Sequence, residues 1–206
     1  QSQGNHAQAL DYYQDSLRIA KETGDKSLIG DALGNIGSVY WAEGNHTKSA
    51  EYFQSCLAIK EEMNDKSGIA LTLNYLGNIS ALQGNHNQAL AHYRKSLSIS
   101  EEIGREATVA ETLRIIADLF YSQGNYTQAL ELANRAAAIA RQIGSPGDLW
   151  EARMTASKAH RSLNQPDQAR EASVEAIDSI EKLRRQVAGG EQEKQRFFES
   201  KTSPYY

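Results

Sequence analysis

The stretch QGNHNQALAHYRKSLSISEEIG, residues 83–104, decides the fold because related copies of it recur along the chain. The copies run from 3 to 24, from 43 to 64 and from 123 to 144, and a more divergent one, LNQPDQAREASVEAIDSIEKLR, begins at 163. Gly4, Gly44, Gly84 and Gly124 therefore stand at one fixed interval of forty residues. A period of this length indicates a stacked repeat array rather than a single globular core.

Each repeat is predicted to hold two helices that meet at the Gly-Asn pair. Apolar residues recur at helical spacing after the pair, as in Leu90, Tyr93 and Leu97, and a second apolar-periodic run precedes it. The glycine suits the left-handed turn that ends one helix, and the asparagine suits the N-cap of the next. Expected caps are Asn5, Asn45, Asn85 and Asn125. We expect one helix at 5–23, followed by antiparallel pairs at 26–63, 66–103, 106–143 and 146–185.

The composition narrows the classes of partner. The 206 residues carry a net charge of -4 with mixed signs, so no basic stripe for nucleic acid and no polybasic membrane patch are apparent. No apolar run is long enough to span a bilayer. Because Cys56 is the only cysteine, no intramolecular disulfide is possible, and a reducing cytoplasm is the expected compartment. The chain starts at Gln1 in the middle of a repeat, and we therefore expect it to be part of a longer protein.

Several residues, taken one at a time, suggest a metal site or a catalytic group. Comparison with the equivalent positions of the other repeats argues against each of these interpretations. His6, His46 and His86 hold equivalent positions about one helix pair apart, too far apart to share one metal ion. Cys56 occupies a slot that holds serine or alanine in the other copies, which indicates packing rather than a nucleophile. Adjacent glutamates such as Glu101 and Glu102 point about 100° apart on a helix, so they do not form a catalytic carboxylate pair. We interpret them as solvated surface residues. We predict no catalytic residue, no metal site and no cofactor.

The spacing small-Leu-x-x-Leu/Ile-Gly-x-x-Tyr, then Gly-Asn-His/Tyr-x-x-Ala, resembles the tetratricopeptide repeat in a forty-residue form. The matching residues are Leu33, Ile36, Gly37, Tyr40, Gly44, Phe53 and Cys56 in the first full repeat, Leu73, Leu76, Gly77, Gly84, His86, Ala89, Tyr93 and Ser96 in the second, and Leu113, Ile116, Ala117, Phe120, Gly124, Tyr126, Ala129 and Ala136 in the third. The resemblance implies an all-α, right-handed α-solenoid. Its expected parts are a half repeat at 1–24, full repeats at 25–64, 65–104, 105–144 and 145–185, and a helical extension at 186–206.

In that family the first helix of each pair lines a concave groove, so the resemblance also implies where a ligand binds. Amides there can bond to a peptide backbone, aromatic rings can pack on its side chains, and cations can take a carboxylate. The residues of this chain that stand at the family's groove positions are Asn35, Ser38, Trp41, Asn74, Tyr75, Asn78, Arg114, Asp118, Tyr121, Lys158 and Arg161. Asp31, Glu111 and Glu151 occupy inward positions beside them.

The C-terminal residues carry a second resemblance. Gly189 and Gly190 predict a break before a short helix, EQEKQRFFESK, which Ser203-Pro204 ends. Ile180-Glu181, Leu183-Arg184, Gly190-Glu191, Arg196-Phe197-Phe198-Glu199 and Pro204-Tyr205 resemble the junction that leads from tetratricopeptide repeats into a CHAT domain in bacterial, notably cyanobacterial, proteins. The caspase-like peptidase residues of such a domain would lie beyond Tyr206, and Phe197, Phe198, Tyr205 and Tyr206 are expected to dock on a neighbour.

Three functions remain open at this point. A protein-interaction scaffold that binds a peptide or protein segment in the groove is favoured. A self-assembly module that stacks through the apolar ends of the array, and a peptide-sensing regulatory receptor, are the alternatives. An enzyme acting through this chain alone is disfavoured.

Overall fold

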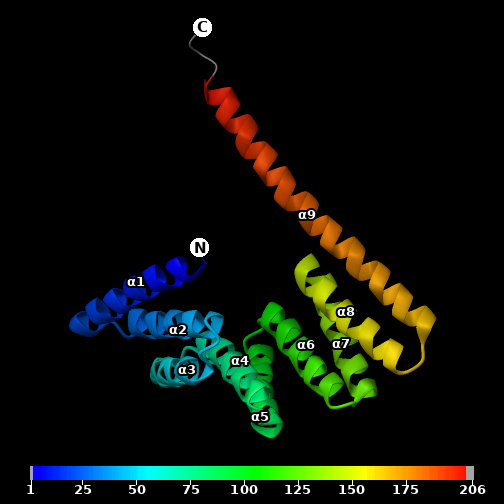
Figure 1. The fold of residues 1–206 in the computed structure, drawn as a ribbon, viewed down its shortest axis with the longest axis horizontal. Coiled ribbons are helices and arrows are strands. Elements are labelled where there is room, and N and C mark those ends of the chain that lie inside the picture. The colour runs from blue at the N-terminus through cyan, green and yellow to red at the C-terminus, as the bar shows by residue number, and fades with distance from the viewer. Residues whose placement is uncertain (1, 203–206) are drawn as a thin grey trace. The chain divides into compact units, whose positions relative to one another are not determined.

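The structure, a computed structural model, describes the backbone of residues 2–202 and the side chains of residues 6–185. All regular structure within residues 2–202 is helical, and the helices are joined by short turns (Figure 1). Their bounds are α1 Ser2–Thr23, α2 Lys26–Ala42, α3 His46–Glu62, α4 Lys66–Leu82, α5 His86–Glu102, α6 Glu106–Ser122, α7 Tyr126–Gln142, α8 Pro146–Ser162 and α9 Pro166–Thr202. The expected all-α repeat fold is confirmed.

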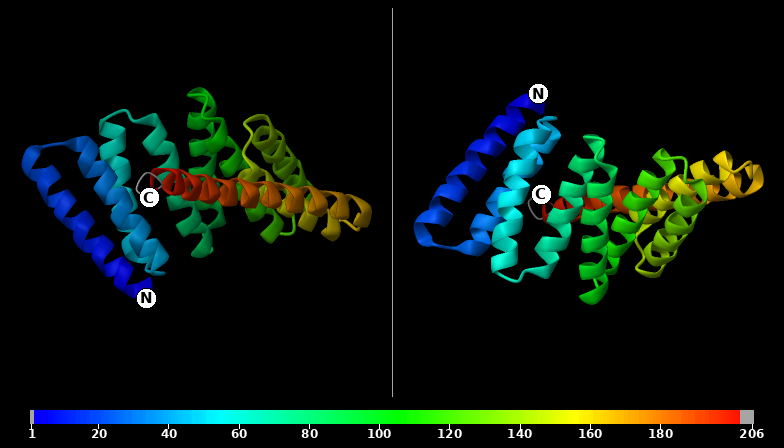
Figure 2. Two further views of the ribbon diagram at one scale, coloured as in Figure 1. Left: turned by 90° about the horizontal axis from the view of Figure 1, so that it is seen from above. Right: turned by 90° about the horizontal axis from the view of Figure 1, so that it is seen from below.

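The turns that separate the helices use a left-handed residue, as the repeat predicts. Gly104 ends α5 with a φ of 66°, and in the equivalent turn after α3 a non-glycine residue, Asn64, takes a φ of 54°. Asparagine tolerates this region better than other side chains because its short amide can bond locally. Such turns reverse the chain within two or three residues, so consecutive helices run antiparallel (Figure 2).

The expected asparagine caps are only partly present. Asn45 caps α3, since its side chain accepts a hydrogen bond from the Lys48 backbone N–H at 3.2 Å. Asn85 and Asn125 stand at the starts of α5 and α7 but make no side-chain cap bond. Asn85 and Asn125 are exposed, so water can satisfy the first N–H groups of these helices. Asn5 lies inside α1, which begins at Ser2.

The chain divides into two compact units, Gln1–Thr112 and Leu113–Tyr206, and each has its own core. The first unit has a core of large side chains, in which Phe53, Leu76 and Ile79 form a buried cluster with Trp41 and Tyr75 packed against it. The second unit buries Leu113 and Ile116 and also contains a cluster of small side chains, the fully buried Ala117, Ala133, Ala156 and Ala172 of four successive helices. Small residues let helices approach closely, so both solutions fill the space between repeats.

One pair of slots shows how each repeat keeps its helices in contact. Gly77 of α4 lies so close to the Tyr93 ring of α5 that a Cβ on Gly77 would come 2.3 Å from Tyr93 Cε1. Tyr93 is 1% exposed and fills the space that the glycine leaves open. The same slots hold Gly37 and Phe53 in the preceding repeat, and Ala117 and Ala133 in the second unit. A glycine is therefore matched by a ring, and an alanine by an alanine.

The C-terminal segment differs from the sequence prediction. The helix α9 runs from Pro166 to Thr202 and passes through Gly189 and Gly190 without a break. Two glycines cost a helix only about 2 kcal/mol in total relative to alanine, which does not end a helix whose flanking residues favour it. The start of α9 packs against α8, and its later part extends past α8 (Figure 1). The expected docking of Phe197, Phe198, Tyr205 and Tyr206 lies outside the described side chains.

Candidate functional site

A pocket of about 470 Å³ opens in the first unit between the facing sides of α2 and α4. Side chains of α3, which lies behind these two helices, form part of its lining. The pocket exists because small residues occur at positions that carry larger ones elsewhere: Gly34 corresponds to Asn74 and Arg114 in the next repeats. The lining residues are Gly30, Asp31, Gly34, Asn35, Ser38, Phe53, Cys56, Lys60, Asp65, Ser67, Gly68, Leu71, Thr72 and Tyr75.

A lysine and two carboxylates form the charged part of this pocket. Lys60 is only 8% exposed, and its Nζ lies 2.7 Å from Asp31 Oδ1 and 3.1 Å from Asp65 Oδ2. Burial alone would lower the pKa of Lys60, but the hydrogen bonds to both carboxylates outweigh it and raise that pKa. A hydrogen bond from the Gly68 backbone N–H, helped by Lys60, lowers the pKa of Asp65. Both shifts favour the charged forms of Lys60 and Asp65, and one lysine with two aspartates carries a formal excess of one negative charge.

The neutral walls of the pocket are fixed by hydrogen bonds and stacking. The buried Cys56 thiol donates to the Gly30 carbonyl oxygen across 3.2 Å, and Ser96 makes the equivalent bond to Ala70 in the next repeat. Burial raises the pKa of Cys56, so the thiol stays protonated. The ring of Tyr75 stacks on Phe53 with centroids 4.5 Å apart. Cys56 thus has the structural role predicted for it, and Tyr75 is held in one orientation.

The predicted groove residues of the first unit fall into different environments. Asn35 is exposed and Ser38 half-buried, and both line the pocket together with Tyr75. Trp41 lies at the end of α2, where its ring packs on His46 with centroids 5.0 Å apart. These side chains are therefore gathered on α2 and α4, the two helices that frame the pocket.

Two further predicted groove residues are tied into the protein. Asn74 is 3% exposed, and its Nδ2 donates to Thr112 Oγ1 at 2.8 Å. Asn78 is half-buried, and its Oδ1 accepts a hydrogen bond of 2.8 Å from the Tyr93 hydroxyl. Both amides join neighbouring helices, so their substitution would change packing as well as any ligand contact.

In the second unit the predicted cation Arg114 is already paired. Its Nη1 lies 2.8 Å from Asp118 Oδ2 and its Nε 2.8 Å from Glu151 Oε2, which links α6 to α8. Asp118 also accepts a hydrogen bond of 2.7 Å from the Thr155 hydroxyl. An incoming carboxylate would have to compete with two resident ones for Arg114, so this residue is better suited to joining helices than to capturing an anion.

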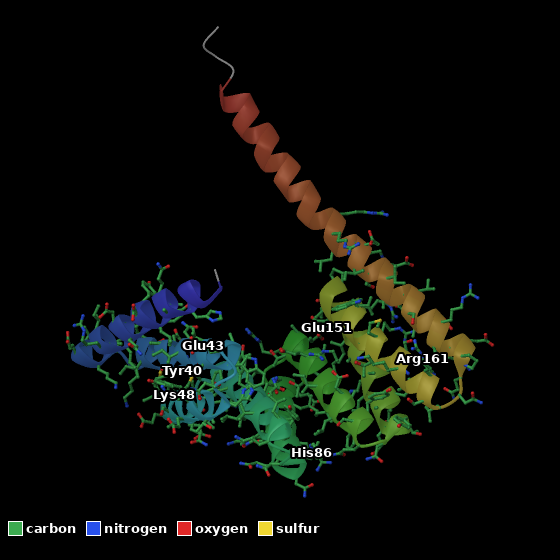
Figure 3. All side chains as sticks on the ribbon, viewed as in Figure 1. Tyr40, Glu43, Lys48, His86, Glu151 and Arg161 are labelled. Atoms are coloured by element: carbon green, nitrogen blue, oxygen red, sulfur yellow. The ribbon has the colours of Figure 1, made fainter. Side chains whose placement is uncertain are left out.

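The other predicted residues of the second unit lie further along the same helices. The ring of Tyr121 packs against Tyr126, and its hydroxyl accepts a hydrogen bond of 3.3 Å from Ser162. Lys158 and Arg161 of α8 are exposed, and Figure 3 shows Arg161 on the half of α8 away from Glu151. These two basic side chains, rather than Arg114, are accessible to a partner.

The histidines at equivalent repeat positions, which could suggest a metal site, lie in different environments. His46 is half-buried against Trp41, whereas His86 is exposed at the start of α5 (Figure 3). Among residues with described side chains, no group of three or more histidine, cysteine or acidic side chains is placed to hold a metal. Within the part of the chain that the structure describes, no helix is long and apolar enough to cross a membrane.

Sequence reasoning missed the residues that make the pocket, above all Lys60, Asp65 and Gly68. A signal for Lys60 was present, because its slot holds Ser100, Ala140 and Ile180 in the other repeats. A charged residue at a position that is otherwise small or apolar indicates a buried ion pair or a site. The forty-residue period shows what the repeats share, whereas the signal for Lys60 lies where one repeat departs from the others.

Comparisons with known proteins agree with this architecture. The sequence model of the tetratricopeptide repeat matches residues 1–62, 68–142 and 108–182. A comparison with curated proteins gave no match. Similar solved structures include BtubC from P. vanneervenii, with a TM-score of 0.78 and 21% identity over 89% of this chain and 76% of that one.

Two other structures widen the comparison. A Rap protein complexed with Competence and Sporulation Factor has a TM-score of 0.76 and 20% identity over 86% of this chain, which spans 50% of that protein's length. A putative kinesin light chain from Podosopora anserina with TPR-like repeats has a TM-score of 0.67 and 15% identity over 89% of this chain and 91% of that one. At these identities the likeness is one of fold.

The helix pairs and their repeated slots define an all-α repeat scaffold, a class without catalytic machinery of its own. Since the family model covers well over half of the sequence, the chain belongs to the tetratricopeptide repeat family. Such scaffolds mediate interactions between proteins.

Proposed function

We propose that this chain is a protein-interaction module that binds an extended peptide or protein segment along the faces of α2 and α4, with the pocket between them as its anchoring point. The observation that carries this proposal is the pocket itself, which combines a fixed aromatic ring, Tyr75, with the accessible polar side chains Asn35 and Ser38. Pockets of this size with a few convergent polar groups are the usual form of a ligand site.

The second unit contributes a separate contact region in this proposal. Lys158 and Arg161 are exposed on α8, where they can pair with acidic groups of a protein partner. Surface pairs of this kind contribute about 0.2–1 kcal/mol each and mainly accelerate association. Support for a peptide ligand also comes from a solved structure of similar fold, the Rap conjugation gene regulator of the plasmid pLS20, which is in complex with the Phr* peptide.

The test uses peptide arrays probed with purified protein, followed by affinity measurement on the captured sequences. We expect Asn35→Ala to weaken capture at least fivefold while leaving the fold intact, since Asn35 is exposed. Tyr75→Ala should weaken capture by a similar factor and also lower the stability, because the Tyr75 ring stacks on Phe53 and packs against the buried cluster. Gln54→Ala, an exposed change on α3 away from the pocket, is the matched control. Unchanged capture by both pocket variants would place the ligand elsewhere.

We further propose that the module is regulatory in its parent protein. The residues that resemble a CHAT junction, from Ile180 to Tyr205, imply a caspase-like peptidase domain for which the array recruits a substrate, partner or activator. The free thiol of the single cysteine, Cys56, is compatible with action in a bacterial cytoplasm. Sequencing beyond Tyr206 is the direct test, and the absence of a downstream His/Cys pair in a caspase-like pattern would remove this part of the proposal.

Self-assembly is the second candidate, because one helix face is unusually apolar. On α1, Tyr12 is 71% and Ile19 48% exposed, whereas Tyr52 and Ile59 in the same slots of α3 are half-buried. Another helix laid on this face would cover both residues. Light scattering on this chain with and without Tyr12→Ser and Ile19→Ser tests this. Oligomers that persist unchanged in the double variant would rule out this face as the contact.

A further inference from the structure

The residues that line the pocket between α2 and α4 favour one class of ligand side chain, and this preference does not follow from the repeat fold alone. Gly68 is a structural requirement, because a Cβ there would come 2.5 Å from Asp65 Oδ2 and 2.7 Å from Lys60 Cδ. At Gly34 a Cβ would stand 3.5 Å from Cys56 Sγ, an ordinary contact, so the space there is open. The pocket is thus a feature of this repeat, built where Asn74, Arg114 and Met154 would fill the same slot in the others.

The charges in the pocket favour a cation. Lys60 already has two carboxylate partners, and the pocket holds one negative charge in excess. Asp31 is the accessible member, since its side chain is 59% exposed while that of Lys60 is 10% exposed. An incoming carboxylate would meet Asp31 and Asp65 before it reached the buried lysine, and would be repelled. An incoming ammonium or guanidinium group could pair with Asp31, which would then have two cationic partners, Lys60 and the ligand.

The neutral walls suit the stem of a long basic side chain. Leu71 is 47% exposed at the mouth, and Tyr75 is held in place by its stacking on Phe53. Methylene groups of lysine or arginine pack well on such surfaces, and an aromatic ring also attracts the cation itself. Asn35 and Ser38 stand beside them with groups that can bond to the backbone of an extended peptide.

We propose that this pocket takes a lysine or arginine side chain of a bound peptide, so that Asp31 pairs with its charged end while Leu71 and Tyr75 hold its stem. The proposal rests on the function proposed above and adds a residue-level specificity to it. It predicts that ligands of this module carry a basic residue at one fixed position.

The experiment uses positional-scanning libraries of acetylated, amidated decapeptides in which one position is fixed as Lys, Arg, norleucine or Glu. The wild-type chain is expected to capture the Lys and Arg libraries about fivefold better than the norleucine library at one position, with Glu weakest. Asp31→Asn should reduce this preference to near the norleucine level. Glu51→Gln, which removes an exposed carboxylate of α3 outside the pocket, should leave it unchanged.

A second variant keeps the test valid if Asp31→Asn disturbs Lys60. Gly34→Met places in the pocket the residue that Met154 supplies in the equivalent slot, and it should abolish the basic preference while circular dichroism shows an intact fold. Capture of peptides without a preference for Lys or Arg would overturn this inference and leave the proposed function standing. Absence of capture from every library would overturn both.

Discussion

At the scale of residues, Gly77 shows that the residue type at one position can depend on a contact with another. Gly77 lies inside a helix because the Tyr93 ring packs against it. A glycine inside a helix normally costs about 1 kcal/mol relative to alanine. Here the glycine admits a ring that is 1% exposed, and burial of an aromatic side chain contributes more than that cost. The equivalent pair in the second unit, Ala117 and Ala133, is smaller in total, and its small side chains let the two helices approach closely.

We predict that Gly77→Ala destabilises the protein by about 1–3 kcal/mol, because the new methyl group would overlap the Tyr93 ring. Gly37→Ala should cost less, since its Cβ would lie 3.3 Å from the Phe53 ring. In a Tyr93→Ala background, Gly77→Ala should become neutral or stabilising, as alanine is at ordinary helix positions. Urea unfolding of the four-member cycle measures this, and additive effects would contradict the packing account.

The candidate site could be predicted from sequence only where residues act at the surface. Asn35 and Ser38 line the pocket from α2, the helix on which the period places them, and their role in binding stays a prediction. Asn74 was expected in the groove and is buried, because its side chain reaches Thr112 on α6. The period indicates which face of a helix a residue occupies but not how far a particular side chain extends toward the next helix.

At the scale of elements, the helices and turns were predictable in detail because one local pattern is repeated. The exceptions are cases where local preference competes with context. Asn85 and Asn125 are favourable cap residues, but their helix starts are exposed and make no side-chain cap bond. Gly189 and Gly190 are unfavourable in helices, but α9 continues through them. Propensity is a weak guide wherever a neighbouring helix or water supplies the alternative.

The start of α4 yields a pH-dependent prediction. Asp65 accepts the Gly68 N–H bond as the N-cap of α4 and also pairs with Lys60, and its pKa is lowered in the folded state. The stability that this carboxylate contributes is therefore complete above the unfolded-state pKa, near 4, and is lost as the pH falls through the folded-state value. Asp65→Asn should lower the unfolding free energy at pH 7 by about 1–2 kcal/mol and flatten its decline below pH 4.

The control for this change is Asp25→Asn, because Asp25 caps α2 through the Leu28 N–H in the same way and has no lysine partner at hand. It should cost only a few tenths of a kcal/mol, since asparagine caps a helix about as well as aspartate. Thermal melts of the wild type and both variants between pH 2.5 and 7 separate the outcomes. Equal losses at pH 7 would show that the ion pair with Lys60 adds nothing.

At the scale of the whole molecule, the two units differ in what fills them. The first contains the cluster around Phe53 and the buried Lys60 group, whereas the second contains a cluster of four alanines in addition to buried Leu113 and Ile116. Repeat arrays gain stability from each repeat and from its contacts with neighbours, so damage at one point need not reach the far repeats. The two kinds of packing therefore predict two separable stabilities.

We predict that Gly77→Ala lowers amide protection in α3–α5 by at least tenfold while protection in α7 and α8 changes by less than threefold. Hydrogen exchange followed by mass spectrometry resolves these helices as separate peptides. Ala133→Gly, a change in the core of the second unit, should give the reverse pattern. A uniform loss of protection along the chain would mean that the array unfolds as one cooperative body.

The matched slots of Gly77 and Tyr93 also limit how such a chain can be recombined. Moving α4 alone to another repeat would place a glycine opposite Ala133 and leave a void, and moving α6 alone would set Ala117 against a tyrosine ring. A helix pair transplanted together carries its own complement and avoids both faults. Between repeats whose slots differ in this way, the unit of exchange in gene duplication or in protein engineering is thus the hairpin and not the single helix.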